Sequence, residues 1–101
     1  MDLPIICTLS EAELQERRHN LLDSIRAKTV ETLSVSNGYA YKFNGSPDVI
    51  APLAQLIALE HQCCPFLTFK LIAEAGKEDV ILEITGPPEA KAVIENFFGA
   101  F

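Results

Sequence analysis

Hydrophobic residues recur at helical spacing near the start of the chain. The segment Ser10–Glu13 fits a capping box, because a hydroxyl at the N-cap is followed three residues later by a carboxylate. The apolar positions that follow are spaced to share one helix face: Leu14, Leu21, Leu22 and Ile25. The pattern predicts a helix from about residue 11 to residue 27.

The pattern then changes to one that is typical of strands. Residues 29–36 are rich in β-branched side chains, and Asn37-Gly38 is a strong signal for a two-residue hairpin turn. Beyond the turn, Tyr39, Tyr41 and Phe43 alternate with Ala40 and Lys42, as expected of a strand with one buried face. This region therefore predicts a β-hairpin.

Helical spacing returns after Ser46-Pro47, which reads as an N-cap followed by a proline at the first helical position. We expect this second helix to run to about residues 61–64, because Pro65 disfavours a helical conformation at Cys64. Pro52 falls about one turn into the helix and lacks the N–H of a regular turn. The helix must therefore fray or bend near Pro52.

The last third of the chain repeats the hairpin-then-helix order. Residues 66–75 and 79–85 predict a second hairpin around Gly76-Lys77, and Gly86-Pro87-Pro88 precedes a last helix. One face of that helix carries Val93, Ile94, Phe97 and Phe101. The element order α-ββ-α-ββ-α predicts a single α+β domain over residues 1–101. Its two hairpins form a four-stranded antiparallel sheet, and its three helices can cover one face.

Composition and charge narrow the possible functions. A chain of 101 residues with 49% hydrophobic residues suits one globular domain. Its net charge of -6, with no basic cluster larger than Arg17-Arg18, argues against binding to nucleic acid or to anionic membranes. The sequence shows no signal peptide and no apolar stretch of the ~20 residues that cross a bilayer. We therefore expect a cytoplasmic protein with reduced cysteines.

Glu60 interrupts the apolar stripe of the second helix. The stripe runs through Leu53, Leu56 and Ile57, and then reaches Glu60 and Cys64. A buried carboxylate is costly unless it is protonated, paired or bound to a metal. Two interpretations remain open. Glu60 belongs to a functional site with the neighbouring cysteines, or it pairs with Arg18 of the first helix and fixes how the two helices dock.

The adjacent cysteines Cys63 and Cys64 are the strongest local signal for chemistry. Neighbouring side chains on a regular helix diverge, but Pro65 predicts an irregular end at which both sulfurs can converge. Two thiolates suit a soft ion such as zinc or copper(I), or a thiophilic metalloid. Cys7 would supply a third thiolate if its segment packs nearby, and His61 would add a nitrogen. The alternative is that these cysteines only pack in the core.

A nucleophilic role fits these cysteines less well. They lie at the C-terminal end of a helix, where the dipole disfavours a thiolate, and the Glu60 carboxylate disfavours it further. Both effects favour a bound cation over a free nucleophile. The sequence contains no Gly-rich phosphate loop and no G-x-S-x-G, H-E-x-x-H or EF-hand pattern. Binding is therefore favoured over an enzymatic role.

The segment E-H-Q-C-C-P-F-L-T-F resembles a group of small bacterial proteins of unassigned function that share an E-x-x-C-C-P-F motif. The matching residues here are Glu60, Cys63, Cys64, Pro65 and Phe66. The resemblance extends to an E-R-R helix at residues 16–18 and to T-G-P at residues 85–87. It covers most of the chain and implies that the site lies at the cysteine pair, but it implies no activity.

These observations lead to one hypothesis and two rivals. The first is a small cytosolic protein that binds a soft metal ion or metalloid through Cys63 and Cys64, assisted by Glu60, Cys7 or His61. The second is a structural or protein-interaction module without a metal. The third is a thiol redox protein that cycles a strained disulfide between the two cysteines. The partner is then a metal ion or a protein, and the aromatic residues after residue 96 are core or a homodimer contact.

Overall fold

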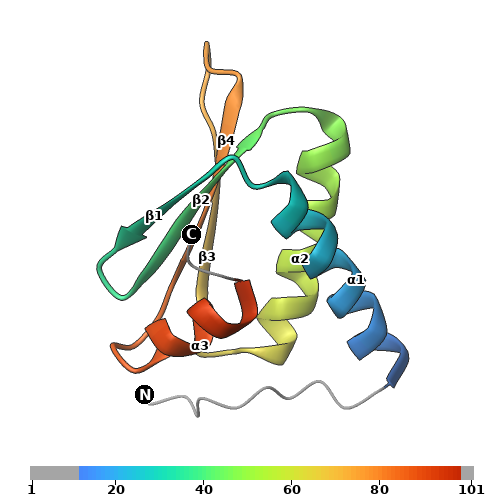
Figure 1. Cartoon of the computed structure of the whole chain (residues 1–101), viewed down its shortest axis with the longest axis vertical. Coiled ribbons are helices and arrows are strands. Elements are labelled where there is room, and N and C mark those ends of the chain that lie inside the picture. The colour runs from blue at the N-terminus through green and yellow to red at the C-terminus, as the bar shows by residue number, and fades with distance from the viewer. Residues whose placement is uncertain (1–11, 99–101) are drawn as a thin grey trace.

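The computed structural model describes residues 12–98, without the side chains of residues 12–15, 17, 18, 63 and 97. The elements follow the expected order α-ββ-α-ββ-α (Figure 1). They are α1 (Ala12–Lys28), β1 (Glu31–Val35), β2 (Gly38–Asn44), α2 (Pro47–Cys63), β3 (Thr68–Ala73), β4 (Asp79–Thr85) and α3 (Ala90–Phe98). The fold class predicted from the sequence is confirmed. The predicted contribution of Phe101 lies outside the described residues.

The four strands form one antiparallel sheet in the order β1-β2-β4-β3. The two hairpins are joined because β4 pairs with β2 on one side and with β3 on the other. Leu82 in β4, for example, lies between Tyr41 in β2 and Leu71 in β3. β2 and β4 are therefore the two central strands, and their pairing joins the two hairpins into one sheet.

The helices cover one face of this sheet (Figure 1). α1 packs along α2, and α3 lies against β2 and β4. Alternate residues of the two central strands face the helices and are buried: Tyr39, Tyr41, Phe43, Val80, Leu82 and Ile84. The residues between them, such as Lys42 and Glu83, lie on the uncovered face and are only partly buried. This is the alternation expected of an antiparallel sheet with one face toward solvent.

The first hairpin forms where it was predicted, but its turn is shifted by one residue. Asn37 has a φ of 62°, whereas Gly38 already pairs with Val35 as part of β2. A Cβ added at Gly38 would collide with the backbone carbonyl oxygen of Ile84 in β4. Glycine is therefore required here for the close approach of β4 rather than for the turn itself.

α2 begins as predicted, with Ser46 at the N-cap and Pro47 at the first helical position, although the Ser46 side chain makes no capping hydrogen bond. The helix continues through Pro52. Proline has no N–H with which to bond the carbonyl of Asp48, four residues earlier. The ammonium group of Lys28, at the end of α1, instead donates a hydrogen bond to that carbonyl oxygen at 3.4 Å. α1 thus supplies a hydrogen-bond donor for the carbonyl group that Pro52 leaves without one in α2.

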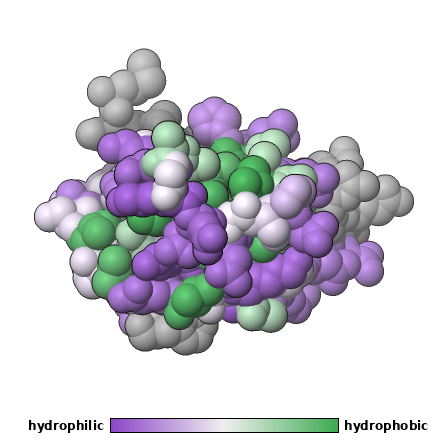
Figure 2. Space-filling model, turned by 90° about the horizontal axis from the view of Figure 1, so that it is seen from above, coloured by the Kyte–Doolittle hydropathy of each residue, from purple (hydrophilic) through white to green (hydrophobic). Residues whose placement is uncertain are grey.

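Figure 2 shows hydrophilic residues over most of the end of the molecule seen from above, with smaller hydrophobic areas between them. Within residues 12–98, no helix has both the length and the apolar character needed to cross a membrane. The core lies between the sheet and the helices, and its largest fully buried side chains include one carboxylate, that of Glu60.

Candidate functional site

The last turn of α2 places a carboxylic acid group inside the protein. Glu60 is 0% exposed, and it continues the buried stripe that Leu53 and Leu56 begin. The three residues recur at spacings of three and four, so they share the face of α2 that points into the core. The burial of Glu60 that the sequence pattern predicted is therefore confirmed.

Cys64 lies directly beside this carboxylic acid group. The Cys64 side chain is 1% exposed, and its Sγ donates a hydrogen bond to Oε2 of Glu60 at 3.6 Å. The contact joins residues four apart in the sequence, which is the separation at which side chains meet on a helix. The structure thus brings together two of the five predicted site residues.

The backbone at the end of α2 explains how Cys64 reaches this position. Its N–H donates the last helical bond to the carbonyl of Glu60 at 2.7 Å, but its φ of −123° and ψ of 75° are no longer helical. The chain then turns, and the N–H of Leu67 bonds to the carbonyl of Cys64 at 3.1 Å. The irregular helix end predicted from Pro65 is therefore present.

The turn after Cys64 is held against the rest of the fold. Phe66 and Leu67 are both buried, and both lie close to Gly86, which precedes α3. A Cβ added at Gly86 would lie 3.2 Å from the carbonyl oxygen of Phe66 and 3.2 Å from a methyl carbon of Leu67. The end of α2, the start of β3 and the approach to α3 therefore meet at the turn that follows Cys64.

The structure describes the other predicted site residues only in part. Cys63 is the last residue of α2, but its side chain is not described. Cys7 lies outside the described residues, and the side chain of Arg18 is likewise not described. His61 is exposed on the surface of α2, unlike its neighbour Glu60. The predicted contact of Glu60 with Arg18, and the roles of Cys63, Cys7 and His61, stay predictions.

The described side chains alone do not form a metal site. Among them, no group of three or more histidine, cysteine, aspartate and glutamate residues is placed to hold an ion. The Glu60-Cys64 pair offers one sulfur and one carboxylate, and a thiophilic ion needs further sulfur. Cys63 is the residue that chain connectivity places nearest to supply it.

Sequence reasoning missed a second polar cluster, between β1, β2 and α3. The ammonium group of Lys91 lies 5.0 Å from the centre of the Tyr39 ring and donates to the Ser34 hydroxyl at 2.6 Å. Burial raises the pKa of Tyr39, and so does the nearby carboxylate of Glu95. Burial also raises the pKa of Tyr41, whose ring centre lies 6.3 Å from that of Tyr39. This cluster fastens α3 to the sheet.

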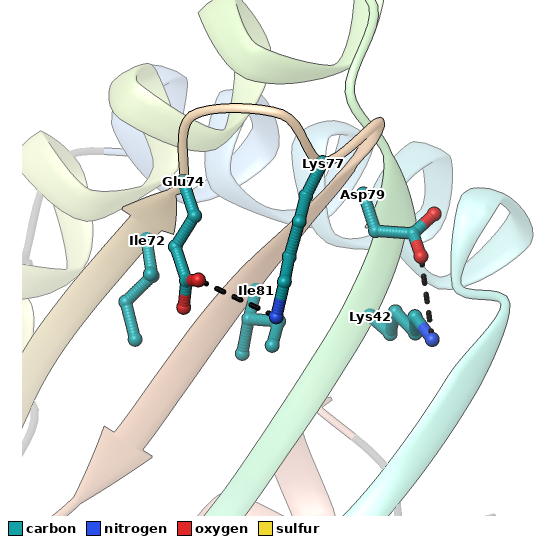
Figure 3. Close-up of a pocket in the computed structure, with 6 residues that line it drawn as sticks. All are labelled: Lys42, Ile72, Glu74, Lys77, Asp79 and Ile81. Atoms are coloured by element: carbon teal, nitrogen blue, oxygen red, sulfur yellow. Dashed lines mark ion pairs between the residues drawn. The ribbon is translucent and has the colours of Figure 1, made fainter.

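A shallow hollow of about 290 Å³ lies on the uncovered face of the sheet, near the β3-β4 turn. Ile72 and Ile81 line it together with four charged side chains (Figure 3). Those charges are paired. The ammonium nitrogen of Lys77 lies 3.4 Å from a carboxylate oxygen of Glu74, and that of Lys42 lies 3.3 Å from a carboxylate oxygen of Asp79. Because each charge has an opposite partner and the hollow is open, it is a weaker candidate site than the end of α2.

Comparisons of the chain with protein-family models, with curated proteins and with solved structures give no significant match. The candidate site therefore rests on the residues and geometry of this chain.

Proposed function

We propose that this chain is a small cytoplasmic protein that binds a soft metal ion or a thiophilic metalloid through Cys63 and Cys64, with Glu60 beside them. The observation that carries the proposal is the contact between the Cys64 thiol and the Glu60 carboxylic acid group at the irregular end of α2. The bacterial proteins that share the E-x-x-C-C-P-F motif supply no activity of their own, so the proposal depends on the chemistry of these side chains.

Three physical features support binding of an ion. Thiolates are the preferred ligands of soft ions, and two adjacent cysteines provide two of them within one turn of chain. A helix C-terminus and a nearby carboxylate both favour positive charge, so they favour a bound cation over two bare thiolates. Binding displaces the thiol protons, and Glu60 is within reach of the Cys64 thiol as a proton acceptor or as a further ligand.

The binding test is an anaerobic titration of reduced, metal-free protein. We expect one equivalent of zinc, copper(I) or arsenite to bind the native chain, and we expect no stoichiometric binding after Cys63→Ser combined with Cys64→Ser. Ala58→Ser, an exposed change on the same helix, serves as the matched control and should bind like the native chain. Circular dichroism would check that each variant is folded.

Equal binding by the native chain and the double variant would refute the proposal. Cys7→Ser and His61→Ala extend the same titration. Weaker binding in either variant would identify that residue as an additional ligand, and unchanged binding would restrict the site to the two adjacent cysteines and Glu60.

A second candidate function is a structural one. The complete burial of Glu60 and Cys64 also suits a device that fixes the end of α2 on the sheet and on α3. A chain with this role alone would bind no ion in the titration, although the cysteine variants would still be less stable. The titration therefore separates the two functions, whereas a stability measurement alone does not.

A further inference from the structure

The exposed large hydrophobic side chains of the described structure are concentrated at one strand. Val30 is 61% exposed and Leu33 is 50% exposed, and no other large hydrophobic residue in the described part of the chain is comparably open. Leu33 is the middle residue of β1, and Val30 directly precedes that strand. Leu33 pairs with Ala40 of β2, so its side chain lies on the uncovered face of the sheet, as that of Lys42 does.

β1 is also an open edge of the sheet. It pairs with β2 on one side, and no described strand pairs with its other side. Edge strands are usually protected by charged side chains, especially lysine, by proline or by a bulge. The one charge of β1, that of Glu31, lies at its first position. β3, at the opposite edge, carries the exposed Lys70 in its interior, whereas β1 contains neither lysine nor proline. The two edges therefore differ, and β1 is the one suited to pairing.

We propose that β1 is a dimer interface, at which a second copy of this chain pairs with it in the antiparallel direction about a two-fold axis through Leu33. In this register Leu33 lies opposite Leu33 of the other copy, Thr32 opposite Ser34, and Glu31 opposite Val35. All five residues of β1 then find a partner. The two sheets become one continuous sheet with every helix on the same face.

The charges near β1 favour this register over its neighbours. Glu31 is the one charged residue of β1, and its carboxylate lies 4.0 Å from the ammonium group of Lys42 in β2. A two-fold axis through Thr32, one residue earlier, would bring the Glu31 side chains of the two copies closer together. An axis one residue later, at Ser34, would bring together the two Lys91 ammonium groups that contact Ser34. The axis through Leu33 avoids both repulsions.

The size of the interface predicts how stable the dimer is. An edge of five residues is short, and interfaces at the small end of the observed range belong to weak, reversible complexes. Each copy also carries a net charge of -6, so the copies repel each other at long range. Because salt screens that repulsion, the dimer should become more populated as the ionic strength rises.

Sedimentation velocity of the full chain over a wide range of concentration tests the proposal. We expect a reversible change from monomer to dimer, and we expect Leu33→Lys to remain monomeric at every concentration. Thr68→Lys, an exposed change on the opposite edge strand, is the matched control and should dimerise like the native chain. A native chain that stays monomeric, as it would if another segment of the same chain covered β1, overturns the proposal.

Cross-linking tests the register independently of stability. Residues directly opposite in an antiparallel pair have Cα atoms roughly 4.5–5.5 Å apart, within the range of a disulfide. Leu33→Cys should therefore form a covalent dimer under mild oxidation, above the level set by the native cysteines. Val35→Cys should not, because the two copies of residue 35 lie four positions apart along the strand, roughly 13 Å. Equal cross-linking of both variants would refute this register.

Discussion

The thiol of Cys64 and the carboxylic acid group of Glu60 meet in the interior, where neither is reached by solvent. A buried polar group contributes to stability only while its hydrogen-bonding partner is present. Glu60 also fills space among apolar side chains, including that of Leu56. Its removal would therefore leave a cavity and remove the acceptor of the Cys64 thiol.

We expect Glu60→Ala to lower the free energy of unfolding by about 2–4 kcal/mol, from the cavity and the lost acceptor together. Glu60→Gln, which keeps the shape and an acceptor oxygen, should cost less. His61→Ala alters the exposed neighbour on the same helix and should change stability by no more than about 0.5 kcal/mol. Urea unfolding measures all three variants, and equal effects of Glu60→Ala and His61→Ala would contradict the prediction.

A second prediction at the residue scale concerns Tyr41. Burial raises the pKa of its hydroxyl above the ordinary value, Tyr39 adds to this effect, and Arg26 opposes it. Below about pH 10 the hydroxyl is protonated in both the folded and the unfolded chain. Above that pH the unfolded chain releases the proton first, so the free energy of unfolding falls as the pH rises.

The test compares urea unfolding at about pH 9 and about pH 11, on either side of the ordinary tyrosine pKa. The native chain should lose stability between these two values, and Tyr41→Phe should lose less because it has no proton to release. All other ionisable groups are common to both proteins, so their contributions cancel in the comparison. An identical loss in both proteins would show that Tyr41 does not contribute.

The candidate site could be predicted from the sequence only where the spacing of residues in one helix determines a contact. The separation of four residues placed Cys64 beside Glu60, and the apolar stripe predicted that Glu60 is buried. The pairing of Glu60 with a residue of α1 depends on how two helices dock, which spacing within one helix does not determine. The Tyr39-Glu95-Lys91 cluster was missed for the same reason, because its members come from β2 and α3.

At the scale of elements, α2 shows how one helix compensates for a defect in another. Pro52 leaves the carbonyl of Asp48 without its usual helical donor, and Lys28 supplies one from α1 at 3.4 Å. The hydrogen bond is long and its donor is exposed, so it replaces only part of what a helical N–H would contribute.

Pro52→Ala should therefore raise the free energy of unfolding by about 1–3 kcal/mol, because alanine restores the N–H and has high helix propensity. The contribution of Lys28 should depend on the proline: Lys28→Met should be destabilising in the native chain and close to neutral in Pro52→Ala. Thermal unfolding of the four proteins of this double-mutant cycle measures the dependence. Pro88→Ala, in the turn before α3, is the control and should not stabilise the fold.

At the scale of the whole molecule, the element order and the fold class were predictable, but the order of the strands was not. Each hairpin is a local structure, signalled by its own turn residues around Asn37 and Gly76. The pairing of β2 with β4 joins segments that are far apart in the chain, and no local pattern indicates it. The shifted turn at Asn37 follows from the same pairing, since Gly38 is required by β4.

The central place of β4 has a consequence for how the protein is made. During synthesis β1, β2, α2 and β3 all leave the ribosome before β4, yet β2 and β3 are each completed only by pairing with it. One edge of β2 and one edge of β3 therefore lack their hydrogen-bonding partner until β4, the last strand, emerges. Contacts of such long sequence separation also slow folding. Completion of the sheet must then be a late step, and only α1, α2 and the β1-β2 hairpin can form before β4 emerges.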